Sequence, residues 1–387
     1  MADMAIGRLT MLAYLLLLTI GSALSLAGVV TNDVAAGFKV DTAIVGYCFT
    51  FFSVGYAIAI LGNGFILNKF DVRKELLTAT ALIVIAVLGA VSQSSLVAFA
   101  IFIFLYGLGS GVLCSISYYL IINLYTEEVQ RTAKLNILNF FFSVGAIVTP
   151  ILAGAALARG MGWKLVMLGT LIPVLAVAFF AYSQQLKMKF RGDHIIEDSS
   201  DAEVWNAKIY VIGLAILCYV VSEMSYGYWV VMYIMEKLTV GLDVASSFLS
   251  IFWVFMAIGR FLAGVFIAKV NIVNYLLWAS GLSSLAAFAL VVSNKLYLSM
   301  VIAAVMGLGY SGIYATLVAY GTELLNHPSS KLTTFFLTIG AGAGVLAFVV
   351  SSYLKQVLGM IATMGFVAIL MVAVFTFTLL AGKIMKC

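Results

Sequence analysis

The chain is 387 residues long, 64% hydrophobic and only 10% charged, with a mean hydropathy of +1.14. Soluble domains carry about 25% charged residues, so this composition excludes a water-soluble globular fold. The formal net charge of +5 comes from positive residues scattered at the ends of apolar runs, which excludes the basic patch of a nucleic-acid-binding protein. The four cysteines are not spaced as a disulfide framework or a metal site, and we expect neither a metal nor a cofactor.

The apolar runs have the length of membrane-spanning helices. Each contains ~20 residues or more, whereas the strands of a membrane barrel are ~10 residues long with alternating hydropathy. A helix satisfies its own backbone hydrogen bonds in hydrocarbon. The sequence therefore predicts an all-α polytopic membrane protein, and we interpret the first apolar run, which is too long for a signal peptide, as an uncleaved helix.

Charges, Gly/Pro clusters and polar dipeptides divide the chain into twelve candidate spans. They are 9–37, 43–68, 75–95, 97–124, 135–158, 162–185, 208–235, 244–269, 273–293, 296–324, 331–355 and 358–382.

One strongly polar stretch, from Lys187 to Asn206, lies near the midpoint of the chain. It is rich in charge and lacks apolar periodicity, so it cannot bury enough surface to form a core. We therefore expect an N-terminal six-helix bundle (1–186), a cytoplasmic linker (187–206) and a C-terminal six-helix bundle (207–387).

The distribution of lysine and arginine predicts the orientation in the membrane. With both termini and the linker on one side, fifteen of the 21 positive residues lie on that side and six on the other. Positive residues concentrate on the cytoplasmic side of membrane proteins. We therefore expect both termini in the cytoplasm and place the chain in the plasma membrane, the inner membrane of a bacterium.

The two predicted bundles are related in sequence. At a shift of 200 residues, twelve of the forty positions in 52–91 are identical to their counterparts in 252–291, and the tripeptide GLG at 107–109 recurs at 307–309. Matches that continue through three helices indicate a duplicated six-helix unit, and the equal orientation of the halves is expected of parallel repeats. The predicted architecture is two pseudo-symmetric six-helix bundles.

The segment GFILNKFDVRK, which begins at Gly64 and follows the second span, resembles the short-loop signature of the major facilitator superfamily. Two positions depart from that signature, because Asn68 replaces its usual aspartate and Asp71 its usual glycine. The segment GRFLAG at 259–264 is the counterpart in the second half. The basic residues either take part in gating or simply anchor the cytoplasmic ends of helices, except for Arg260, which lies deeper in its span. The residues assigned to the cytoplasmic loops and to gating are Gly64, Lys69, Arg73, Gly259 and Arg260.

Three longer segments indicate which group within that superfamily the chain resembles. KLNILNFFFSVGAI (134–147), LCYVVSEMSYGYW (217–229) and IGRFLAG (258–264) resemble the fucose–proton symporter group, and most closely its TsgA-type relatives, over nearly the whole chain. The resemblance implies twelve helices, alternating access and usually proton coupling. It also implies that Asp33 is a functional acid and that Asn139 occupies a sugar-contacting position. Where the symporters have a second acid, this chain has Cys114.

Glu223 lies near the middle of the seventh predicted span. A charged group there costs roughly 2.5–3.5 kcal/mol unless it faces water or a partner, so an acid at this depth suits the uptake and release of a proton. Tyr219 and Tyr226, at i−4 and i+3, share its helix face. The structural alternative is a neutral glutamic acid that is hydrogen-bonded between helices.

Asp33 is the second candidate for proton coupling, and two positions remain open for it. Counted from Leu9, a helix has spanned ~30 Å by about residue 29. Asp33 therefore lies either at the outer membrane interface, where it is merely solvated, or inside a tilted helix that continues to Phe38.

Neutral polar side chains recur in the predicted spans and would give a cavity with hydrogen-bonding and aromatic surfaces. Such a cavity suits a sugar or a similar polyhydroxylated metabolite, whereas the alternative for each residue is polar contact between helices, worth about 0.6 kcal/mol per bond. The candidate substrate-binding residues are Asn136, Asn139, Tyr118, Tyr219, Tyr226, Tyr310 and Tyr314.

The sequence predicts a secondary active transporter that moves a small polar, sugar-like metabolite by alternating access, with protons as the coupling ion. One alternative is an efflux pump or uncoupled facilitator of the same fold, and another is a membrane scaffold or sensor that transports nothing. An enzyme is not expected, because no catalytic constellation is present and the glycine run at 339–344 lacks the strand and lysine of a phosphate loop. We expect a monomer surrounded by lipid that binds a small-molecule substrate and no nucleic acid.

Overall fold

A computed structural model of the protein describes residues 2–66, 71–125, 127–183, 207–266, 271–322 and 330–384. Within these ranges the regular structure is entirely α-helical, which confirms the predicted all-α fold. The chain divides into two compact units, Met1–Asp193 and His194–Cys387. The predicted linker, 187–206, lies outside the described residues, so its bounds stay a prediction.

The first unit corresponds to the first six predicted spans. Within it α2 packs against α4, α1 against α5, and α3 against α4. The sixth span is divided at Thr170, three residues before Pro173, because proline donates no backbone hydrogen bond and restricts the residue before it. The helices are α1 (Ala2–Phe38), α2 (Thr42–Ile66), α3 (Val72–Ser92), α4 (Leu96–Leu124), α5 (Glu128–Ala158), α6 (Trp163–Gly169) and α7 (Leu171–Ser183).

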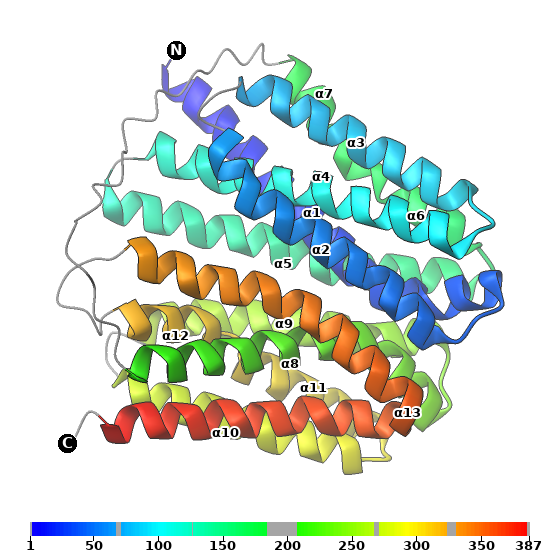
Figure 1. The fold of residues 1–387 in the computed structure, drawn as a ribbon, viewed down its shortest axis with the longest axis vertical. Helices are drawn as coiled ribbons and strands as arrows, with labels where there is room; N and C mark the ends of the chain where they lie inside the picture. The colour runs from blue at the N-terminus through cyan, green and yellow to red at the C-terminus, as the bar shows by residue number, and fades with distance from the viewer. Residues whose placement is uncertain are drawn as a thin grey trace. The chain divides into compact units, whose positions relative to one another are not determined.

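The second unit contains the remaining spans. Its helix α13 is interrupted at Gly359, where φ is 83° and ψ is 177°, a conformation that is almost confined to glycine. Figure 1 shows the two parts of α13, orange and red, running in opposite directions. The helices are α8 (Ala207–Leu238), α9 (Leu242–Phe266), α10 (Ile272–Val292), α11 (Leu296–Tyr310), α12 (Ile313–Thr322) and α13 (Ser330–Ile384).

Eleven stretches of the described residues are long and apolar enough to cross a membrane. The last of them, Phe335–Gly382, contains 48 residues, and a continuous helix of that length would extend ~72 Å. A bilayer core is only ~30 Å thick, and the turn at Gly359 divides this stretch into two spans. The described part of the chain therefore has the predicted twelve spans.

The helices of the second unit repeat those of the first at the shift found in the sequence. The pair α9 and α11 packs together as α2 and α4 do, and α10 packs on α11 as α3 does on α4. The start residues of the matching helices are Thr42 and Leu242, Val72 and Ile272, and Leu96 and Leu296.

Equivalent residues make equivalent contacts in the two units. A Cβ atom on Gly107 would overlap the carbonyl oxygen of Phe52, and one on Gly307 would overlap that of Phe252. In each case the glycine lets two helix backbones touch. The helix caps repeat as well, since Asp71 caps α3 and Asn271 caps α10 through their side-chain oxygens. The duplication predicted from the sequence is therefore present in the packing.

Candidate functional site

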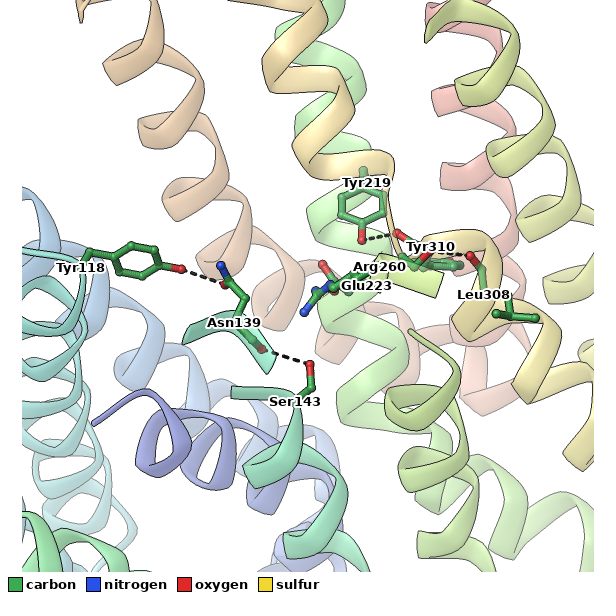
Figure 2. A network of polar contacts seen from close by, with 9 residues as sticks. Tyr118, Asn139, Ser143, Tyr219, Glu223, Arg260, Leu308 and Tyr310 are labelled. Carbon is green, nitrogen blue, oxygen red and sulfur yellow. Dashed lines mark hydrogen bonds and ion pairs between the residues drawn. The ribbon is translucent and has the colours of Figure 1, made fainter. Parts of the chain in front are cut away.

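Glu223 and Arg260 face each other in the second unit. Glu223 lies on α8 and Arg260 on α9, and the distance from Nη2 of the arginine to Oε1 of the glutamate is 3.9 Å. Figure 2 shows the two side chains converging from their helices. The Glu223 side chain is 10% exposed and that of Arg260 33% exposed. The sequence predicts separate roles for these two residues, and the structure brings them together.

The helical hairpin explains why the two residues meet. Only residues 239–241 connect α8 to α9, so residues at equal distances from this turn have similar depth. Glu223 is 15 residues before Leu238 and Arg260 is 18 residues after Leu242, a difference in depth of about 5 Å. The long arginine side chain spans that difference. Arg260 therefore lies about one turn from the level of Glu223, well inside the helix.

The pair has a simple acid–base chemistry. A buried carboxylate is costly unless a cation or hydrogen bonds compensate it, and Arg260 supplies the cation. Arginine does not lose its proton in proteins. Glu223 is therefore the member of the pair that can exchange a proton, and protonation would remove its attraction for Arg260.

Hydroxyl groups on either side of Glu223 tie α8 to its neighbours. The Tyr219 hydroxyl donates to the backbone carbonyl of Tyr310 at 2.9 Å. The Ser222 hydroxyl donates to the carbonyl of Val367 at 2.9 Å and lies 2.7 Å from the Tyr310 hydroxyl. Because serine has a single hydroxyl proton, Tyr310 is the donor to Ser222. These bonds hold the Glu223 segment of α8 against α11 and α13.

Ser222 was not among the residues predicted from the sequence. A hydroxyl beside an intramembrane acid was the available signal, but serines are frequent in these spans. Its two partners, Tyr310 and Val367, come from distant parts of the chain, so the local pattern does not reveal its role.

The tenth span is broken beside Arg260, which corrects one prediction. Tyr310 and Tyr314 were expected one turn apart on a continuous helix, but α11 ends at Tyr310 and α12 begins at Ile313. The Ser311 hydroxyl donates to the carbonyl of Leu308 at 2.7 Å, and such local bonds compete with helical ones. A Cβ atom on Gly259 would overlap the Ser311 side chain, so the glycine before Arg260 lets α9 approach the break.

The four candidate tyrosines of the second unit differ in exposure. Tyr219, Tyr226 and Tyr310 are fully buried, and the ring of Tyr226 packs 4.6 Å from that of Phe252. Tyr314 is only half-buried, and its ring centroid lies 6.3 Å from that of Tyr219. Of the four, Tyr314 therefore has the surface with which to contact a ligand, while the other three pack and orient the interior.

Asn139 is the centre of a polar group in the first unit. The Tyr118 hydroxyl on α4 donates to Oδ1 of Asn139 at 2.9 Å, and Nδ2 of Asn139 donates to the carbonyl of Leu135 at 2.9 Å. The Ser143 hydroxyl donates to the Asn139 carbonyl at 3.2 Å, and Figure 2 shows this group at the α5 segment. An amide group has two N–H donors and an oxygen that accepts twice. One donor and one acceptor position of the half-buried Asn139 amide are therefore left for a ligand. The side chain of Asn136 lies outside the described residues.

Asp33 lies within helix α1 in the structure. Helix α1 continues to Phe38, and Asp33 lies half-buried five residues before that end. The helix therefore continues to Phe38, as the second alternative requires, whereas the depth of Asp33 in the membrane stays a prediction. The role of Asp33 in coupling stays a prediction. Cys114, which stands where the symporters have an acid, is buried and accepts a hydrogen bond from the Tyr56 hydroxyl at 3.1 Å.

Arg73 connects two helices of the first unit. Its Nη2 donates to the carbonyl of Tyr182 at 3.3 Å, and its guanidinium lies 5.6 Å from the centroid of the Tyr182 ring. It therefore holds the start of α3 to the end of α7. Gly64 lies in the last turn of α2, whereas Lys69 is outside the described residues.

Comparisons with known proteins agree with this architecture. The family model described as Major Facilitator Superfamily matches residues 10–347. The protein TsgA homolog of Yersinia pseudotuberculosis serotype O:1b (strain IP 31758) is 28% identical over 382 residues, which is 98% of this chain and 96% of the relative. The TsgA homolog of Yersinia pestis (strain Pestoides F) has the same identity and coverage.

Solved transporter structures share the fold. A D-xylose-proton symporter superimposes with a TM-score of 0.78 at 16% identity, covering 96% of this chain and 97% of that one. The nucleoside transporter NupG gives a TM-score of 0.77 at 13% identity, with coverages of 96% and 98%. A bacterial homolog of the human lysosomal transporter Spinster, in an inward-facing and unoccupied conformation, gives 0.77 at 13% identity, with coverages of 99% and 97%.

Proposed function

Because the chain belongs to the Major Facilitator Superfamily, and is therefore an integral membrane transporter and not an enzyme, we propose that it is a secondary active transporter that couples a small, polar, sugar-like metabolite to protons. The observation that carries this proposal is the ion pair between Glu223 and Arg260, at 3.9 Å inside the helices α8 and α9. Ionisable residues inside a membrane pair with one another and mark ion pathways and proton relays.

Protonation of Glu223 determines whether Arg260 is held in the ion pair. When Glu223 is ionised, it holds the guanidinium in the ion pair. When a proton binds to a carboxyl oxygen, the attraction disappears, and the Nη2 group of Arg260 that faces Glu223 becomes available to acceptors such as substrate hydroxyls. Proton binding and substrate binding are thus linked through one side chain.

The substrate class follows from the neutral polar groups. Asn139 offers one donor and one acceptor, Tyr118 orients it, and the half-buried ring of Tyr314 offers a stacking surface. Neutral hydrogen-bonding groups in the first unit and an aromatic surface in the second are the kinds of group that bind a sugar-like ligand, which has neither a formal negative charge nor a long apolar tail. Asn136 and Asp33 complete the proposed set, Asp33 as a second proton site.

The location and the domain organisation also remain part of the proposal. We place both termini and the linker 187–206 in the cytoplasm and the chain in a bacterial inner membrane as a monomer. Gly64, Lys69, Arg73 and Gly259 are assigned to the cytoplasmic loops and gate, and Arg260 to the deeper end of that gate, where it pairs with Glu223. The distribution of lysine and arginine supports this orientation.

The experiment is transport by the purified full-length chain in proteoliposomes, after a thermal-shift screen of sugars and small metabolites at two pH values has identified a substrate. Glu223→Gln should abolish accumulation driven by a pH gradient and should retain exchange of labelled for unlabelled substrate, because exchange needs no net proton movement. The matched control is Glu236→Gln, an exposed acid near the end of the same helix, which should transport as the wild type does. Undiminished proton-driven accumulation by Glu223→Gln would refute the coupling role, and uptake that never exceeds equilibrium in the wild type would identify a facilitator.

A further inference from the structure

We propose that Tyr219 is a positioning residue for the proton on Glu223, because its hydroxyl oxygen accepts the hydrogen bond that the protonated carboxyl group donates. This inference rests on the proposed function, since it concerns the acid that binds the coupling proton. The two residues are one turn apart on α8, and the carboxyl group lies within hydrogen-bonding reach of the Tyr219 hydroxyl. Tyr219 is 1% exposed, so its hydroxyl is shielded from bulk water.

The hydrogen of the Tyr219 hydroxyl is committed to a backbone carbonyl. It is donated to the carbonyl oxygen of Tyr310 at 2.9 Å. Tyr310 is the last residue of α11, and the last four carbonyls of a helix have no partner within it. A tyrosine hydroxyl has one hydrogen and accepts through its oxygen. While the bond to Tyr310 is kept, the oxygen of Tyr219 can therefore only accept from Glu223.

An acceptor beside Glu223 distinguishes the two forms of this acid. The protonated carboxyl group has an O–H to donate, whereas the ionised group is an acceptor only. The series of bonds from Glu223 to Tyr219 to the Tyr310 carbonyl is therefore complete only when the proton is present. In the ionised form the carboxylate has Arg260 as its partner, at 3.9 Å. Glu223 thus has a separate partner for each form, the cation for the charge and the phenol for the proton.

The competing arrangement turns the Tyr219 hydroxyl toward the carboxylate. Tyr219 would then donate to ionised Glu223, and the Tyr310 carbonyl would lose its donor. Tyr310 is fully buried, and a buried carbonyl without a donor destabilises the fold. Arg260 already compensates the charge of the carboxylate. The carbonyl therefore has the greater need of the hydrogen.

Other titratable groups face Glu223 from the helices around α8. Arg260 comes from α9, Tyr310 from α11 and Tyr314 from α12, and both tyrosines feel the charge of Glu223. The Tyr310 hydroxyl donates to Ser222, so its hydrogen is not available to the carboxyl group. Among the described phenols, Tyr219 is the one within hydrogen-bonding reach of Glu223.

The rest of α8 and helix α13 do not change this assignment. Tyr226, three residues after Glu223, packs its ring against α9. Ser351 of α13 bonds Trp229, nearly two turns after Glu223 on α8, and the titratable side chains described on α13, at positions 353 and 355, follow that contact. Within the described residues, the acceptor for the proton on Glu223 is therefore Tyr219.

The test is infrared spectroscopy of the purified full-length chain at a series of pH values, which needs no substrate. A protonated carboxyl group has a carbonyl stretching band that an ionised one lacks, and Glu223→Gln identifies the part of this band that belongs to Glu223. In Tyr219→Phe the midpoint of its pH dependence should fall by about 0.5–1 pH unit, the equivalent of one hydrogen bond, because only the protonated form loses a partner. The band should also move to higher frequency, since the O–H group is no longer hydrogen-bonded.

The matched control is Tyr233→Phe. Tyr233 is another buried tyrosine of α8, and its hydroxyl also donates to a backbone carbonyl, that of Leu290 at 3.1 Å. It lies almost three turns after Glu223. Tyr233→Phe should lower the unfolding midpoint about as much as Tyr219→Phe does, and it should leave the Glu223 band and its pH midpoint unchanged.

Three results would overturn the proposal. A pH midpoint that rises in Tyr219→Phe would show that Tyr219 donates to the ionised carboxylate. An unchanged midpoint and band would show that Tyr219 only ties α8 to α11, as Tyr233 ties α8 to α10. The absence of a Glu223-dependent band at every pH would show that Glu223 holds no proton.

Failure of the proposed function would look different. Proton-driven accumulation that persists in Glu223→Gln would refute the coupling role alone, because a carboxyl group can bind a proton and donate it to Tyr219 without driving transport. The infrared result for Tyr219→Phe would stand in that case.

Discussion

Replacing Arg260 by methionine tests how much the Glu223–Arg260 ion pair contributes to the free energy of unfolding. With an effective dielectric constant of ~20, two charges at the observed 3.9 Å attract each other by about 4 kcal/mol. One third of the Arg260 side chain is exposed, and screening by solvent reduces the expected contribution to about 2 kcal/mol. For a unit of this size, that free energy corresponds to a fall of about 4–8 °C in the unfolding midpoint.

The assay is thermal unfolding of the purified protein over a range of pH, in a double-mutant cycle with Glu223→Gln. Arg260→Met should destabilise the wild type by the stated amount at neutral pH and much less in the Glu223→Gln background, with a coupling energy of about 2 kcal/mol. The loss should shrink as the pH falls, because a protonated Glu223 does not need a cation. An equal loss in both backgrounds, or a loss that is independent of pH, would show that Arg260 stabilises the fold through other contacts.

Two further substitutions test helix packing, one between α2 and α4 in the first unit and one beside Glu223 in the second. Gly107→Ala places a methyl group against a neighbouring backbone carbonyl. It should lower the free energy of unfolding by about 3 kcal/mol or more, which is measured as a lower unfolding midpoint. The control Gly342→Ala, with open space around it, should be neutral or slightly stabilising. Ser222→Ala removes the acceptor of the Tyr310 hydroxyl and should destabilise by about 1–3 kcal/mol, while an unchanged midpoint would mean that the tyrosine finds another partner.

Hydropathy predicted the helices well because every span in lipid must satisfy its own backbone hydrogen bonds, so each long apolar stretch forms a helix. The third span was expected at 75–95 and is Val72–Ser92, and the turn between the last two spans was expected between 355 and 358 and is at Gly359. The break after Tyr310 was not predicted, because it depends on a serine hydroxyl and a glycine that hydropathy does not distinguish from their neighbours.

The candidate site was predicted in its residues but not in its pairings. Glu223 was found because an acid in an apolar span is conspicuous, and Arg260 because it lies deeper than its basic neighbours. Counting residues from the turn between α8 and α9 would have placed the two at similar depth. The direction in which each side chain leaves its helix is set by packing, so the ion pair needed the structure.

The pairing of Glu223 with Arg260 also has an electrical consequence. With both side chains ionised the pair is neutral, and with a proton on Glu223 it carries one positive charge. A unit charge that crosses a membrane potential of 100 mV gains or loses about 2.3 kcal/mol. The voltage of the cell therefore acts on the protonated carrier and leaves the unprotonated one almost unaffected, so under the proposed mechanism the potential itself would set the direction in which the loaded site prefers to face.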